Sequence, residues 1–181
     1  VIAKKGDAAA HLARQFFDDT ITRTYIALAW GDIQNETGTI KTKIARHQRF
    51  RKIFDAYPLD EETGKIAITH FKVLENFHYV TLVQCTLETG RTHQIRVHFK
   101  HIGHTLFNDA AYGGDKILKG TVYTRYKQFV ENCFEQCPRI ALHAKTLGFI
   151  HPSTKKEMLF EAPVPEDMQR LMEKWRGYIQ S

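Results

Sequence analysis

The chain has 181 residues, of which 43% are hydrophobic and 25% charged, which is typical of a globular domain with one core and excludes a disordered chain. No apolar run approaches the roughly 20 residues of a membrane-spanning helix, and the first residues lack the pattern of a signal peptide. The formal net charge of +6 favours a polyanionic partner, RNA or DNA before an anionic membrane.

The chain begins with VIAKK, which resembles the end of a strand whose beginning is absent, so we expect a segment to precede Val1. Cysteines 85, 133 and 137 show no disulfide or zinc spacing, which favours a reducing compartment and small buried side chains. The remaining pattern predicts residues 1–181 to be a single domain, incomplete at its N-terminus.

The first elements are a helix and a strand. Asp7 is a candidate N-cap for a helix over residues 8–17. Residues 22–31 follow as a strand, with Tyr25, Ala27 and Ala29 on one face and apolar residues on the other. A strand that is apolar on both faces is usually interior to a sheet.

A basic segment covers residues 38–65 and ends in turn-forming and acidic residues. It predicts an extended, hairpin-like excursion with a solvated tip. The segment is either a charged loop or a clamp on phosphates. In the second case its RNA-binding residues are Lys43, Arg46, Arg49 and Arg51.

Residues 65–77 and 78–88 alternate in polarity and predict two paired antiparallel strands. Gly90 ends the second strand. Thr92 is then a candidate cap for a helix over residues 93–102, and Gly103 stands where a C-terminal glycine is expected.

The rest of the chain predicts a helix around 126–134, a hairpin over 139–163 with its turn at 151–156, and a terminal helix opened by Pro165. The apolar face of that helix includes Trp175 and Ile179. This order of elements predicts the α+β class, with a mixed, mostly antiparallel sheet and flanking helices.

The junction between residues 87 and 99, LETGRTHQIRVHF, concentrates positive charge where a strand passes into a helix. Arg91 lies at the turn, His93 opens the helix, and Arg96 follows about one turn later. Free N–H groups in the first helical turn and a planar guanidinium both suit an oxyanion. The alternative is that Arg96 pairs with a structural carboxylate, while His98 and His101 line the polar face.

Three segments, TYIALAWG, ETGRTHQIRVH and LHAKTLGFIHP, resemble in this order the RluA-type pseudouridine synthases, over nearly the whole chain. The resemblance implies the fold of their catalytic domain and the conversion of uridine to pseudouridine in RNA, without a metal or an organic cofactor. It also implies that an aspartate is the essential catalytic group.

By the same resemblance, Arg96 pairs with that aspartate, and Tyr25 lies against the uracil and is a candidate for moving its proton. Ile95 packs near the base. The other substrate-binding positions that the resemblance suggests are Arg91, His93, Leu142 and His143. The implied partner is RNA, and ribosomal RNA is favoured over transfer RNA. We expect the protein to be a cytoplasmic monomer.

The chain departs from the family pattern mainly by an absence. The family's aspartate precedes a strand that ends like VIAKK, so we expect it upstream of Val1, and Asp109 matches a separate loop. Where the family more often has Gly and Pro, this chain has Ala45, Gln48, Thr105 and Asn108. Two alternatives are a catalytically inactive, synthase-like RNA-binding protein and, because of ten histidines, a ribonuclease that uses His93 or His98.

Overall fold

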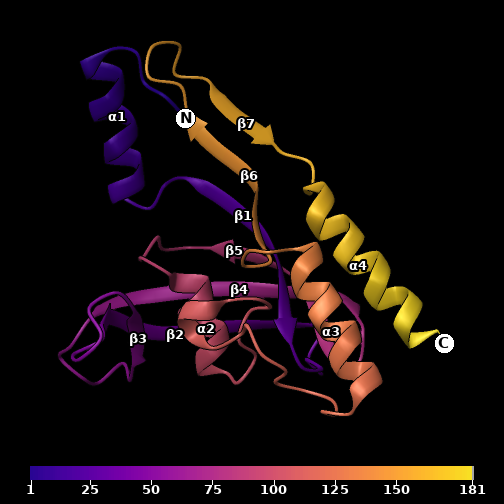
Figure 1. The fold of residues 1–181 in the computed structure, drawn as a ribbon. Coiled ribbons are helices and arrows are strands. Elements are labelled where there is room, and N and C mark those ends of the chain that lie inside the picture. Colours follow the sequence, from indigo (N-terminus) through magenta and orange to yellow (C-terminus); the bar gives the residue numbers. More distant parts are fainter. Residues whose placement is uncertain (181) are drawn as a thin grey trace.

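A computed structural model describes residues 1–180, and within them one sheet has the strand order β3-β2-β4-β5-β1-β6-β7 (Figure 1). Its strands are β1 (Thr22–Trp30), β2 (Thr37–Arg46), β3 (Phe54–Tyr57), β4 (Lys65–Asn76), β5 (Val80–Leu87), β6 (Leu142–Ile150) and β7 (Glu157–Glu161). The helices are α1 (Gly6–Phe17), α2 (Gln94–His101), α3 (Thr124–Gln136) and α4 (Glu166–Ile179), with a short 3-10 turn, η1 (Ala110–Tyr112). The predicted α+β class is confirmed, although every strand pairing within the described range is antiparallel.

Strand β1 lies inside the sheet, between β5 and β6, as its two apolar faces predict. Its side chains alternate between two separate clusters. Ile26 and Leu28 pack with α3 and α4, whereas Ala27 and Ala29 pack with α2. The side chain of Tyr25 belongs to the second cluster, and therefore to the face on which α2 lies.

The helices cover the two faces of the sheet unequally. Helices α3 and α4 lie side by side against one face (Figure 1). On that face the rings of Trp175 and Trp30 have their centroids 6.2 Å apart. Helix α2 packs against β2, β3 and β4 on the other face. No helix within residues 1–180 combines the length and the apolar composition that crossing a membrane requires.

The predicted helix ends need correction. Helix α1 begins at Gly6, so Asp7 lies in its first turn and is not the N-cap. Helix α2 begins at Gln94, and His93 occupies the N-cap position with φ of +57°, while the Thr92 side chain caps nothing. The reason is that the Gln94 side chain accepts the backbone N–H of Arg91 and holds the turn from within.

The C-terminal end of α2 agrees with the prediction. Gly103 has φ of +81° and donates its N–H to the carbonyl of Lys100, while His104 donates to that of Phe99. This pair of bonds is the Schellman motif, which favours glycine at that position. In α4, Trp175 is fully buried as expected, but Ile179, in the last turn of the helix, is 45% exposed.

The basic segment forms a hairpin with an exposed tip, as predicted, but this hairpin is part of the sheet and not a separate excursion. Strand β2 pairs with β4 along most of its length and with β3 near its end, so only the loops at 47–53 and 58–64 extend from it. The hairpin of β6 and β7 forms as predicted, with its turn at 151–156. Residues 1–5, expected to be the end of a strand, have no regular secondary structure here.

Candidate functional site

A cavity of about 240 Å³ lies where β1, the end of β5 and the start of α2 meet. Its lining residues are Tyr25, Leu87, Arg91, His93, Gln94, Ile95, Arg96 and Leu142. It therefore brings together the predicted catalytic and substrate-binding residues, with one exception. His143 lies outside it on β6, where its ring is within 3.3 Å of the carbonyl oxygen of Ala162.

Tyr25 lies on the rigid interior strand β1 at a point where its pairing with β6 is irregular. The register of the two strands shifts between Thr24 and Tyr25. A bulge of this kind bends the backbone locally and changes the direction of a side chain. The Tyr25 hydroxyl has no hydrogen-bond partner within residues 1–180, so this tyrosine is not a core residue with a satisfied hydroxyl group.

Arg96 is held by a buried carboxylate. Its Nε lies 2.8 Å from Oδ2 of Asp109 and its Nη2 lies 2.7 Å from Oδ1, which makes a two-pronged ion pair. Asp109 is 1% exposed, and the guanidinium lies 4.8 Å from the ring centroid of Tyr112. Nη1 has no protein partner within the described residues and remains available to a second anion.

The loop that carries Asp109 is fixed against β1. The N–H of Phe107 donates to the carbonyl of Leu28 at 2.8 Å, and the N–H of Gly114 donates back to Asp109 at 2.8 Å. Asn108 has φ of +58°, a left-handed conformation that glycine and asparagine tolerate best. The presence of Asn108 where the family more often has glycine is therefore structurally conservative.

His93 lies between the cavity and the hairpin of β2 and β3. Its Nδ1 is 3.0 Å from the hydroxyl of Tyr112, which also accepts the backbone N–H of Phe54 at 3.0 Å. Burial and, after it, the charge of Arg96 lower the pKa of His93, while Asp109 acts in the opposite direction. These contacts fit a neutral ring that accepts the Tyr112 proton at Nδ1 and carries its own proton on Nε2.

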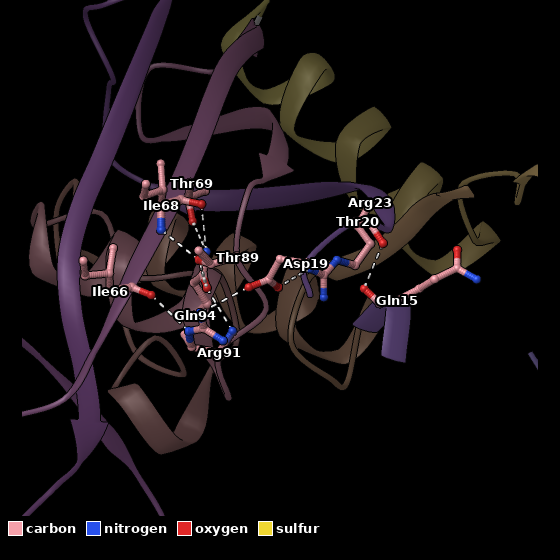
Figure 2. Close-up of polar contacts among 10 residues, drawn as sticks. All are labelled: Gln15, Asp19, Thr20, Arg23, Ile66, Ile68, Thr69, Thr89, Arg91 and Gln94. Atoms are coloured by element: carbon pink, nitrogen blue, oxygen red, sulfur yellow. Dashed lines mark hydrogen bonds and ion pairs between the residues drawn. The ribbon is translucent and has the colours of Figure 1, made fainter. Parts of the chain in front are cut away.

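Arg91 is oriented by two acceptors from different parts of the chain (Figure 2). Its Nε donates to the carbonyl of Ile66 at 3.0 Å, and its Nη2 lies 3.1 Å from Oδ2 of Asp19. The other oxygen of Asp19 lies 3.0 Å from Nη2 of Arg23, which is 8% exposed. One carboxylate thus bridges two arginines beside the cavity.

Gln94 anchors the turn that presents Arg91 and His93. Its side-chain oxygen accepts hydrogen bonds from the hydroxyl of Thr89 and the N–H of Arg91, at 2.8 and 2.9 Å. Its side-chain nitrogen donates to the carbonyl of Ile68 and to Thr69, both at 3.0 Å (Figure 2). A buried amide with all of these partners holds the turn rigidly against β4.

His98 is a structural residue. It is 0% exposed, and its two ring nitrogens contact the hydroxyls of Thr42 at 3.0 Å and Thr69 at 2.8 Å. Burial, with a smaller effect from His101, lowers its pKa to about 4. Because the ring is sealed and fully bonded, the ribonuclease alternative that used His98 is not supported.

The cations of the predicted phosphate clamp lie on β2 and its loop. Lys43 bonds the carbonyl of Glu61, and Arg46 donates to that of Arg51 at 2.7 Å. Arg49 lies over the ring of Phe50, 5.4 Å from its centroid. The side chain of Arg51 has no partner within residues 1–180, and the loop from 47 to 53 is largely exposed.

The residues that line the cavity suit a planar base, and the guanidinium of Arg96 suits an anion beside it. Apolar side chains of Leu87, Ile95 and Leu142 provide contact area, while Tyr25 and Arg96 provide polar groups. Within the described residues, no cluster of three or more His, Cys, Asp or Glu side chains has the geometry to hold a metal.

The alternative that Arg96 pairs with a structural carboxylate is confirmed, and the partner is Asp109 of the separate loop. Sequence reasoning did not assign that pairing, and it missed Asp19, Gln94 and Tyr112, which also position this site. Gln94 stands inside the basic motif, and an amide among arginines was a signal that could have identified it. Asp19 and Tyr112 come from turns without periodicity.

Comparison with known proteins gives concordant results. Residues 1–101 match the family model described as RNA pseudouridylate synthase. A Chlorobaculum parvum protein named as an uncharacterized RNA pseudouridine synthase is 43% identical over 97% of this chain and 54% of its own length. A Vibrio vulnificus ribosomal large subunit pseudouridine synthase D is 41% identical over 97% of this chain and 51% of its own length.

A solved structure of human RNA pseudouridylate synthase domain containing 1 has a TM-score of 0.67 at 24% identity, covering 96% of this chain and 73% of that one. At this identity the likeness concerns the fold. The chain spans about half the length of the curated relatives that it matches.

Proposed function

Because the chain belongs to the RNA pseudouridylate synthase family, we propose that the protein containing it converts uridine to pseudouridine in RNA. In this isomerisation the bond between N1 of uracil and C1′ of ribose breaks and the base turns. A bond then forms between C5 and C1′, C5 loses its proton, and N1 gains one. The reaction consumes no other reactant.

The observation that carries the proposal is one cavity with two unsatisfied polar groups, the hydroxyl of Tyr25 and Nη1 of Arg96. A uridine must leave its stack before its glycosidic bond is accessible, which costs a few kcal/mol. In the proposed complex the apolar lining and Tyr25 receive the extruded base. The bulge at Tyr25 aims that side chain at the base.

In this proposal the catalytic carboxylate either adds to the uridine or assists an elimination. It comes from an aspartate that precedes Val1 in the complete protein. No acidic side chain lines the cavity in residues 1–180. A carboxylate entering it would meet Nη1 of Arg96, whose positive charge favours its ionised form. Asp109 holds Arg96 in place from the other side, which leaves the guanidinium little freedom to drift.

The proposed substrate is ribosomal RNA in preference to transfer RNA, because several relatives are named as ribosomal large subunit synthases. We further propose that the protein is a cytoplasmic monomer and that it needs neither a metal nor an organic cofactor. Lys43, Arg46, Arg49 and Arg51 would contact the phosphates around the site. This assignment is consistent with the exposure of the loop at 47–53, which carries Arg49 and Arg51 at the edge of the sheet.

The test of the function is tritium release from RNA labelled at C5 of uridine. We expect the complete protein to release tritium and Arg96→Ala to lower the rate by at least about a hundredfold, because the catalytic carboxylate loses its partner. Arg125→Ala, an exposed arginine on α3, is the matched control and should retain full activity.

A normal rate for folded Arg96→Ala would contradict the assigned ion pair. RNA binding without any tritium release, across candidate RNAs, would favour the alternative of an inactive RNA-binding protein. We expect the 181 residues alone to bind RNA weakly and to release no tritium, since the proposed aspartate is not among them.

The phosphate clamp is tested separately. We expect Arg49→Ala to weaken RNA binding while the maximal rate remains near that of the unmodified protein. Each lost phosphate contact lowers the slope of log affinity against log salt by about 0.7 to 0.9. Binding measured over a series of salt concentrations checks this, and an unchanged slope would remove Arg49 from the interface.

A further inference from the structure

A second cavity of about 540 Å³ adjoins the first, between the hairpin of β2 and β3 and the turn that follows β5. Its lining residues are Ile44, Ala45, Phe54, Gly64, Lys65, Gly90, Arg91 and Thr92. Arg91 lines both cavities and therefore stands between them. Whatever enters the second cavity lies next to the occupant of the first.

The second cavity has an apolar floor and a positive rim. Ile44 and Phe54, whose side chains belong to one apolar cluster, form the floor, and Lys65 and Arg91 are the lining residues with charge. Lys65 has no ion pair or hydrogen bond from its side chain within residues 1–180. Arg91 uses Nε and Nη2 for Ile66 and Asp19, so its Nη1 remains free of protein partners in this range (Figure 2).

The walls of this cavity are fixed before any ligand arrives. Phe54 is tied to Tyr112 through its backbone N–H at 3.0 Å. A Cβ at Gly64 would lie 2.9 Å from the carbonyl oxygen of Ile44, and a Cβ at Gly90 would lie 2.2 Å from Nη1 of Arg23. The contact at Gly64 is with backbone and disfavours any larger side chain there, whereas the contact at Gly90 is with the end of the Arg23 side chain.

We propose that the second cavity binds the unpaired nucleotide that directly neighbours the target uridine in the RNA, with Arg91 at the phosphodiester group that joins the two. This inference rests on the proposed function of the first cavity. Apolar and aromatic surface beside free cations is the combination that accepts a nucleobase together with its phosphate. The free Nη1 of Arg91 and the unpaired Lys65 provide the charge for that phosphate.

The experiment combines a change in the protein with a change in the RNA. The probe is a single-stranded RNA of about nine nucleotides with one central uridine, made intact or with an abasic spacer on either side of that uridine. In the protein, Thr92→Leu places a bulkier apolar side chain at the cavity, where the Thr92 hydroxyl makes no hydrogen bond within residues 1–180. Ala9→Leu on the exposed face of α1 adds a leucine far from the cavity.

We expect the spacer on one side to weaken binding to the unmodified protein and to Ala9→Leu by about tenfold, the usual effect of losing one stacked base. Thr92→Leu should bind intact RNA about tenfold more weakly, and the spacer on that side should weaken its binding no further. Equal losses in all three proteins, or no loss with either spacer, would overturn the proposal.

A charge variant keeps the proposal testable if Thr92→Leu does not fold. Lys65→Gln should lower the slope of log affinity against log salt by about 0.7, whereas the exposed Lys174→Gln on α4 should not. Identical slopes would count against the proposal. Tritium release by the complete protein tests the proposed function separately. Tritium release without coupling between the spacer and the variant would contradict only this inference. Coupling without tritium release would contradict only the proposed function.

Discussion

At the scale of single residues, Arg96 combines two tasks in one guanidinium. The edge formed by Nε and Nη2 is occupied by Asp109, whereas Nη1 faces no protein group within residues 1–180. A planar, permanently charged group can be fixed through one edge and still present another donor, which a lysine cannot do. The buried pair thus fixes the guanidinium of a residue that lines the cavity and leaves Nη1 without a hydrogen bond within residues 1–180.

The first prediction concerns this pair. Asp109→Asn leaves a guanidinium that is 19% exposed without its counter-charge, so we expect the free energy of unfolding to fall by about 3 kcal/mol. Urea unfolding measures the loss. Glu75→Gln removes the carboxylate from an equally two-pronged pair with Arg176 that is 41% and 34% exposed, and should cost less than about 1 kcal/mol. Similar losses in both variants would show that burial does not set the strength of the Arg96 pair.

At the scale of elements, helix α2 is fixed to the sheet by polar side chains as well as by apolar ones. His98 connects it to Thr42 on β2 and Thr69 on β4, and Gln94 adds bonds to β4. The helix has only eight residues, so its own propensity contributes little to its stability. The position of Arg96 therefore depends on these tertiary contacts.

The second prediction is a dependence of stability on pH. The pKa of His98 falls from 6.5 to about 4 on folding, so between these values the unfolded chain binds a proton that the folded chain does not. The stability contribution is complete above pH 6.5 and is lost as the pH falls toward 4, by roughly 3 kcal/mol in total. Urea unfolding of the unmodified chain and of His98→Gln over this range checks it. Parallel curves for the two proteins would contradict the assignment.

At the scale of the whole molecule, the two faces of the sheet have separate tasks. One face carries α3 and α4, and the other carries α2 (Figure 1). A cluster of aromatic rings lies on the first face, and the cavities lie on the second. Trp175 is 0% exposed and contacts the rings of Trp30, Phe107 and Phe129. Most of the stabilising aromatic contact thus lies away from the candidate site.

The third prediction follows from this division. Trp175→Ala should lower the free energy of unfolding by about 3 to 5 kcal/mol, because it removes a large side chain from a closely packed cluster. Leu74→Ala, at a position 45% exposed, should change it by about 0.5 kcal/mol or less. The fraction of Trp175→Ala that remains folded should bind RNA with normal affinity. Weakened binding by that folded fraction would mean that the two faces are coupled.

The elements themselves were predictable because their signals are local. Each signal involves residues within or next to one element. The signals are the apolar residues on both faces of β1, the alternating polarity of β4 and β5, and the positions of Gly103 and Pro165. The concentration of Arg91, His93 and Arg96 at a junction between strand and helix was equally visible. So was the resemblance to the family, because motifs are contiguous in sequence.

The partners of those residues were not predictable from the amino-acid sequence. Arg96 meets Asp109 across 13 residues, Phe54 meets Tyr112 across 58, and Arg91 meets Asp19 across 72. The residues that complete these pairs lie in turns or loops, where no period reports which way a side chain points. The start of α2 illustrates the same limit, since no side chain caps it and Gln94 holds the preceding turn through bonds to Arg91 and to β4. Periodicity encodes which face of an element is apolar, whereas the meeting of distant turns depends on how the completed sheet brings them together.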